Sequence, residues 1–185
     1  MKKEKDNLVK EITIPEGIES RLKDNIIYIK KNDIELTRKF HPLIIVAIEK
    51  NKITLSAKKN RRTEKKLLGT TYSHIINMIK GLEQGFTYKL QIVNVHFPMS
   101  MSYDKDKNEL IVKNFLGEKK DRKIKLEDGI NVKINKDIIE LASCDIEKAG
   151  RAATRIEQGT KVRNKDRRVY QDGIFLIEKP GRSYL

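Results

Sequence analysis

Hydrophobic and polar residues alternate along several short stretches of this chain. The clearest alternating pairs are Ile12 and Ile14, Ile27 and Ile29, Val46 and Ile48, and Ile53 and Leu55. Strict alternation is typical of a strand with one buried and one solvated face, the usual situation in antiparallel sheets. Over residues 75–82 and 146–156 the apolar positions recur at helical spacing instead. The pattern therefore predicts small antiparallel sheets, each accompanied by one helix.

The chain also repeats itself. Three pairs of strings are similar: VAIEKNKITLS (46–56) and VKINKDIIELA (132–142), GLEQG (81–85) and RIEQG (155–159), and IIYIKKNDIELTRKF (26–40) and LIVKNFLGEKKDRKI (110–124). The matched positions of the first pair are Val46, Ile48, Lys50, Ile53 and Leu55 with Val132, Ile134, Lys136, Ile139 and Leu141. Self-similarity of this kind indicates a duplicated structural unit.

We therefore predict an α+β fold of two duplicated domains, each a small, mainly antiparallel sheet packed on one helix. The expected domains are 1–85 and 86–179, followed by a tail at 180–185. Gly85 and Gly159 close the two helical stretches, at the place where a left-handed residue often ends a helix. The first copy has about a dozen extra residues, which we expect as a basic insertion at 58–68 between strands and helix.

The chain carries a large excess of positive charge. Against 26 Asp and Glu it has 40 Lys and Arg, a formal net charge of +14 over 185 residues. Such an excess opposes folding by self-repulsion and favours a polyanionic partner, nucleic acid first of all. The many Lys, Ile and Asn residues also fit the codon bias of an AT-rich genome. That bias does not favour Arg, yet Arg is clustered at 61–62 and 167–168.

Basic residues are concentrated in three segments, at 57–66, 118–125 and 161–170. A run of charge is most often a solvated face, and we interpret 118–125 in this way, as a hairpin tip. The segment 161–170 differs because it includes Asn164 and Tyr170 and runs into a predicted strand. Arg pairs with phosphates and stacks on bases, while Asn and Tyr offer hydrogen bonds or a stacking face. This segment therefore predicts a fixed RNA-binding surface.

Arrangements that carry catalysis are missing from the sequence. His41, His74 and His96 are isolated, Cys144 is the single cysteine, and no glycine-rich phosphate loop occurs. We therefore predict no enzyme, no metal and no cofactor. One cysteine fits a reducing compartment. No apolar run approaches the roughly 20 residues that span a bilayer, and the charged start at 1–6 is unlike a signal peptide. A soluble, cytoplasmic protein is expected.

Several longer strings resemble one protein family. These are SHIINMIKGLEQGFTYKL (73–90), VHFPMS (95–100), NFLGEK (114–119) and KVRNKDRRVYQDGIFLIEK (161–179). Together they are similar to the large-subunit ribosomal protein L-six family, in its archaeal and eukaryotic branch, over residues 12–179. The family also has two similar α+β domains. One departure is KKNDI at 30–34, where the family usually has a Gly-Pro-x-Gly turn; Asn and Asp can still turn a hairpin there.

The resemblance implies a structural protein of the large ribosomal subunit. Such a protein binds large-subunit rRNA near the sarcin-ricin loop, beside the docking region of translation factors, and contacts neighbouring ribosomal proteins. The resemblance places most of this contact in the second domain. The candidate RNA-binding residues are Lys161, Arg163, Asn164, Lys165, Arg167, Arg168, Tyr170 and Lys179. Arg61 and Arg62 of the first basic segment are further candidates because of their positive charge. The alternative function is a free-standing RNA chaperone or regulatory RNA-binding module.

Three further expectations concern the residues around the third basic segment. Tyr170 and Phe175 should anchor it, with Phe175 packed in the core in preference to contacting an RNA base. Asp172 and Gly173 should form a tight turn before the last strand. Replacing Arg167 and Arg168 by Ala should reduce the salt dependence of RNA binding. The sequence is compatible with an archaeal source and with a eukaryote that has a reduced genome.

Overall fold

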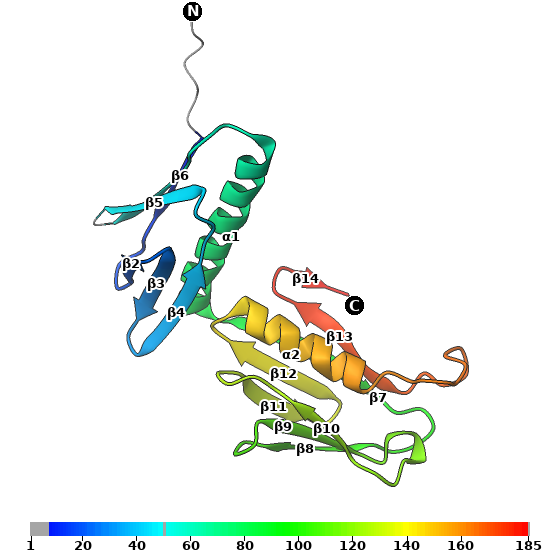
Figure 1. Ribbon diagram of the computed structural model, residues 1–185. Coiled ribbons are helices and arrows are strands. Elements are labelled where there is room, and N and C mark those ends of the chain that lie inside the picture. Colours follow the sequence, from blue (N-terminus) through cyan, green and yellow to red (C-terminus); the bar gives the residue numbers. More distant parts are fainter. Residues whose placement is uncertain (1–7, 50, 185) are drawn as a thin grey trace, which may run out of the picture. The chain divides into compact units, whose positions relative to one another are not determined.

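The computed structural model describes residues 8–49 and 51–184 (Figure 1). The charged N-terminal start at 1–6 and the repeat position Lys50 lie outside the described residues. The chain divides into two compact units, Met1–Gln84 and Gly85–Leu185. Each unit combines one α-helix with antiparallel sheets, so the predicted α+β class is confirmed.

The first unit contains six strands followed by one long helix. Its elements are β1 (Val9–Thr13), β2 (Glu19–Lys23), β3 (Ile26–Lys31), β4 (Ile34–Lys39), β5 (Ile44–Glu49), β6 (Lys52–Ala57) and α1 (Arg62–Gln84). The strands form two antiparallel sheets with the orders β1-β6-β5 and β2-β3-β4. Helix α1 contacts both sheets. The alternating residues Ile27, Ile29, Ile53 and Leu55 are fully buried, as the hydrophobic pattern predicts.

The second unit repeats this arrangement and extends it. Its elements are β7 (Phe86–Val93), β8 (Ser100–Asp104), β9 (Glu109–Lys113), a 3-10 turn η1 (Phe115–Gly117), β10 (Arg122–Lys125), β11 (Asn131–Asn135), β12 (Ile138–Ser143), α2 (Ile146–Gly159), β13 (Gly173–Lys179) and β14 (Arg182–Ser183). The sheet orders are β10-β9-β8 and β11-β12-β7-β13-β14. Helix α2 packs on β12, β7 and β13. Among the described residues of the first unit, no strand corresponds to the last two strands of the second.

The two copies of the repeat form hairpins of the same register. In the first hairpin Val46 faces Leu55 and Ile48 faces Ile53. In the second, the matched residues face each other in the same way: Val132 with Leu141, and Ile134 with Ile139. In each unit the N-terminal strand pairs antiparallel with the second strand of its hairpin, β1 with β6 and β7 with β12. The sequence repeat is therefore also a repeat of strand pairing.

The two glycines that close the helical stretches differ in conformation. Gly85 follows α1 with φ +69°, the left-handed conformation predicted for it. The same prediction is wrong for Gly159, which is the last residue of α2 and is followed by Thr160 at φ −105°. A Cβ atom on Gly159 would lie 2.7 Å from Cδ1 of Ile124. Glycine at this position lets the helix approach β10 closely.

Two basic segments also differ from their predicted structure. Helix α1 begins at Arg62, so most of the expected insertion at 58–68 is helix, and α1 has 23 residues where α2 has 14. The predicted hairpin tip at 118–125 is a loop only up to residue 121, because Arg122–Lys125 forms strand β10. The substituted turn at 30–34 does form a hairpin. Asn32 adopts φ +52° there, between β3 and β4.

Candidate RNA-binding surface

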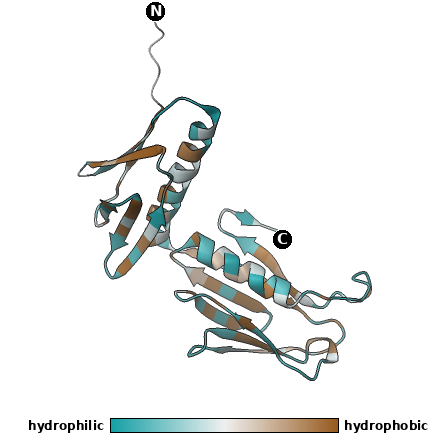
Figure 2. Cartoon of the chain, in the orientation of Figure 1, coloured by the Kyte–Doolittle hydropathy of each residue, from teal (hydrophilic) through white to brown (hydrophobic). Residues whose placement is uncertain are grey.

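The third basic segment is the loop between α2 and β13. It extends outward from the second unit in Figure 1 and is mostly hydrophilic in Figure 2. The cations along it, all exposed, are Lys161, Arg163, Lys165, Arg167 and Arg168. Asp166 is the one acidic residue between them. Exposed guanidinium and ammonium groups can donate hydrogen bonds to phosphate oxygens.

The loop is fixed at its first end by Thr160. The side chain of Thr160 is buried, with 1% exposure. Its hydroxyl donates to the Ile156 carbonyl at 3.0 Å and accepts from the Ile174 backbone N–H at 3.2 Å. The same oxygen therefore joins the end of α2 to the start of β13. Two residues farther on, the buried Val162 joins the core of the second unit.

Arg122 also holds this end of the loop. Its guanidinium donates to the carbonyl of Gly159 at 2.9 Å, which satisfies a free acceptor at the C-terminus of α2. It also bonds to both carboxylate oxygens of Glu118 and lies 3.9 Å from the ring centre of Phe115. The bond from Arg122 lowers the pKa of Glu118. The interpretation of 118–125 as a solvated face is therefore wrong for Arg122, which is half-buried and structural.

The second end of the loop is fixed by Asp172. This carboxylate is 1% exposed and accepts two hydrogen bonds from His96. The backbone N–H of His96 donates one at 2.9 Å, and its ring atom Nδ1 donates the other at 2.6 Å. Burial alone would raise the pKa of Asp172, but the hydrogen bonds and charge of His96 lower it overall. An ionised carboxylate only accepts, so Nδ1 carries the proton in this pair.

The pair of His96 and Asp172 corrects one expectation. Asp172 does not form a tight turn, since it is buried and has no turn assignment directly before β13. His96 has a partner that the sequence does not indicate, because a residue 76 positions away accepts its hydrogen bonds. The ring of Tyr170 lies against His96, with 5.0 Å between ring centres. Tyr170 also packs on the core, so its predicted role as an anchor is confirmed.

Within the loop, Asp166 organises the chain. Its side chain accepts from the Arg168 backbone N–H at 3.0 Å, and its carbonyl accepts from the Tyr170 N–H at 2.9 Å. Arg168 also pairs with the Asp166 carboxylate through its guanidinium at 2.8 Å, which lowers the pKa of Asp166. The ammonium of Lys165 lies 4.4 Å from the Tyr170 ring centre. The basic segment is thus an ordered turn rather than a loose tail.

The remaining candidates lie elsewhere. Lys179 ends β13, at the end away from the loop; at about 3.3 Å per residue this is roughly 20 Å along the strand. There it pairs with Arg182 of β14, and the side chains of both lie near the Tyr184 ring. The tail thus folds back as a short strand. Arg61 and Arg62 belong to the first unit, where the buried Glu64 accepts from the Arg61 backbone N–H at 3.3 Å.

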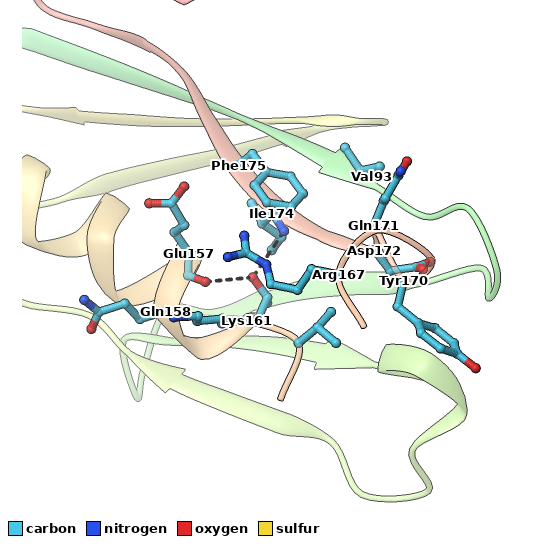
Figure 3. Close-up of a pocket in the computed structure, with 12 residues that line it drawn as sticks. Val93, Glu157, Gln158, Lys161, Arg167, Tyr170, Gln171, Asp172, Ile174 and Phe175 are labelled. Atoms are coloured by element: carbon cyan, nitrogen blue, oxygen red, sulfur yellow. Dashed lines mark hydrogen bonds between the residues drawn. The ribbon is translucent and has the colours of Figure 1, made fainter. Parts of the chain in front are cut away.

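A pocket of about 560 Å³ opens beside the loop (Figure 3). The loop, the last turn of α2 and the start of β13 all contribute to it. Phe175 is half-buried on its wall, whereas Ile174 is buried in the core and Leu176 packs against it. The expectation that Phe175 packs in the core is therefore wrong.

Other kinds of site find no support in the part of the chain that the structure describes. No group of three or more His, Cys, Asp or Glu residues among 8–49 and 51–184 could hold a metal ion. None of the helices in these ranges is long and apolar enough to cross a lipid bilayer. The described residues thus offer a cationic surface, with three groups that sequence reasoning missed: Thr160, Arg122 and the pair of His96 and Asp172.

Comparisons with known proteins identify the family. No family model matches the chain. It is 37% identical over 170 residues to the large ribosomal subunit protein uL6 of Methanobrevibacter smithii, covering 91% of this chain and 94% of that protein. It is 36% identical over 173 residues to uL6 of Methanococcus vannielii, covering 93% and 94%. The α+β chain with its cationic loop thus belongs to the uL6 family of large ribosomal subunit proteins, in its archaeal branch. The family is structural and not enzymatic.

Proposed function

We propose that the chain binds large-subunit rRNA through the loop at 161–170 and so helps to hold rRNA helices in the ribosome. The observation that supports this most is the anchoring of the loop. The loop contains five exposed cations, and it is fixed at one end by Thr160 and at the other by Asp172. Phosphate contacts supply most of the affinity for RNA.

The fixed ends matter for affinity as well as for position. A loose basic tail loses conformational entropy when it binds, and this cost reduces the net free energy of binding. A turn that is already ordered by Asp166 and Tyr170 loses less. The cations then lie at set distances from one another, which favours a structured RNA over an arbitrary polyanion.

We further propose the place of this contact from the family resemblance. The surface would lie near the sarcin-ricin loop, beside the docking region of translation factors. Its partners there would include neighbouring ribosomal proteins, and its location would be the cytoplasmic ribosome. If the chain were instead a free-standing RNA chaperone, it would be absent from the large-subunit fraction of a sucrose gradient.

The test is the salt dependence of binding between the full chain and in vitro transcribed large-subunit rRNA. Replacing Arg163→Gln and Arg168→Gln together should weaken binding and make the log–log slope shallower by on the order of one unit per lost phosphate contact. The matched control is Arg151→Gln with Arg155→Gln, which removes the same charge from the exposed face of α2, where both pair with Glu127. Equal slopes for the two double variants would contradict the proposal.

A further inference from the structure

The pocket beside the basic loop combines apolar walls with polar groups. Val93 and Phe175 contribute apolar surface, while Glu157, Arg167 and Gln171 contribute polar atoms (Figure 3). Its volume of about 560 Å³ falls in the range of sites that bind small organic molecules. The pocket therefore has room for a nucleotide, next to the residues proposed to bind phosphates.

The ring of Phe175 is placed so that a flat ligand could stack on it. It lines the pocket while the strand neighbour Ile174 is buried in the core. The position of Gly173 explains how the ring is held, because a Cβ atom there would lie 3.1 Å from the ring's Cζ atom. Gly173 thus leaves the space in which the ring lies. An aromatic face at a pocket wall is the feature on which proteins stack unpaired RNA bases.

Arg167 supplies the second feature. Figure 3 shows its side chain reaching into the pocket, toward Glu157 and Phe175, whereas Tyr170 points its ring away. Among the described residues Arg167 makes no salt bridge, in contrast to its neighbour Arg168, which pairs with Asp166. A guanidinium can stack on a base or bind a phosphate. The nearby carboxylate of Glu157 can accept from the amino group of adenine, cytosine or guanine.

We propose that this pocket binds one unstacked nucleotide of the rRNA, with its base against Phe175 and Arg167 on the base or its phosphate. The inference rests on the proposed function and deepens it, because it adds base recognition to phosphate contact. Charge favours RNA over a peptide as the occupant. The cations Lys161 and Arg167 at the pocket balance its two carboxylates, Glu157 and Asp172, and Asp172 is already paired with His96. The excess of positive charge comes from the other exposed cations of the loop, Arg163, Lys165 and Arg168.

The first test compares two identical substitutions in the full chain. Phe175→Leu removes the aromatic face, whereas Phe86→Leu changes another half-buried phenylalanine of the same unit, at the opposite end of β7 from Val93. Phe175→Leu should weaken binding to in vitro transcribed large-subunit rRNA about tenfold, because stacking on the base is lost. The salt dependence of binding should stay the same, because no phosphate contact is removed. Equal affinities of the two variants, with thermal unfolding unchanged, would overturn the proposal.

The second test does not depend on replacing Phe175. A photoreactive p-benzoylphenylalanine replaces the exposed Gln171 at the pocket, or Asn135 of β11 as control, in chains incorporated into large subunits. Cross-linking of position 171 to one adenosine, cytidine or guanosine of the rRNA supports the proposal. Cross-linking to a ribosomal protein, or to no nucleotide, overturns it. The salt-slope experiment on Arg163 and Arg168 remains a separate test, so pocket and phosphate surface can fail independently.

Discussion

The two units of this chain share a scaffold and differ in the segment that comes after the helix. Both have a hairpin of the same register, a strand paired beside it and a helix packed on the sheet. In the first unit the helix ends at Gln84, and one glycine later β7 of the second unit begins. In the second unit the chain continues through the basic loop, β13 and β14. The proposed RNA surface and pocket are both in this continuation.

The difference between the units shows how one of two similar scaffolds can carry an added segment. The repeated hairpin and helix form a core that is stable because alternating residues bury one face. The added segment uses that core as a support, through Thr160, Asp172 and Arg122, and leaves its cations exposed. Function is then expected to depend on the added segment, and stability on the repeated one.

The largest expected effects test the equivalence of the two scaffolds. Ile53 and Ile139 occupy matched hairpin positions and are both fully buried. Ile53→Ala and Ile139→Ala should each lower the free energy of unfolding of their own unit by about 2–5 kcal/mol, through lost burial and the cavity left behind. Hydrogen exchange read by mass spectrometry resolves each unit. Ile45→Ala is the control, because Ile45 is 48% exposed and should cost far less.

A cost below about 1 kcal/mol in one unit, with the full cost in the other, would show that the scaffolds are not equivalent. The likeness of the two units would then be limited to their strand pairing.

A smaller effect is expected where the added segment is tied to the scaffold. Asp172→Asn should lower the free energy of unfolding by about 2 kcal/mol, because the buried acceptor of both His96 bonds loses its charge. Asp166→Asn, the matched change at an exposed aspartate, should have a much smaller effect, because solvent screens its pairing with Arg168. Urea unfolding at neutral pH measures both.

The contribution of Asp172 also has a defined pH dependence. Its pKa is lower in the folded chain than the ordinary 3.8, so the folded state binds fewer protons there. The stabilisation is complete above that ordinary value and is lost as the pH falls through it toward the lower folded pKa. In Asp172→Asn this part of the acid sensitivity should be absent. An unchanged acid profile would show that the carboxylate does not hold the loop.

The smallest effects come from two helical glycines. Gly69 in α1 has open space around its Cβ position, so Gly69→Ala should stabilise the chain by about 0.5–1 kcal/mol. A Cβ atom added to Gly159 at the end of α2 would lie 2.7 Å from Cδ1 of Ile124, so Gly159→Ala should destabilise by about 1 kcal/mol through overpacking. The two substitutions should shift the thermal midpoint in opposite directions. A rise of the midpoint for both variants would mean that α2 has room against β10.

Several features of the fold and site could be predicted from the sequence. Alternation and helical spacing are local patterns, so they indicated the strands around Ile53 and Ile139 and both helices. The similar strings indicated the duplication, and longer strings indicated the family. The cationic loop could be predicted from the sequence because its basic residues are close together in the chain. What these signals share is that each depends on residues near one another in the chain.

The rest was decided by tertiary structure, for a physical reason. His96 and Asp172 are 76 positions apart, and neither has a local pattern that marks a partner. Arg122 looks like any residue of a charge run until the C-terminus of α2 is placed beside it. Arg167 and Arg168 are adjacent residues of the same type, so the sequence does not distinguish their roles. In the structure Arg168 pairs with Asp166, whereas Arg167 lines the pocket. Contacts between distant segments depend on packing, which local periodicity does not encode.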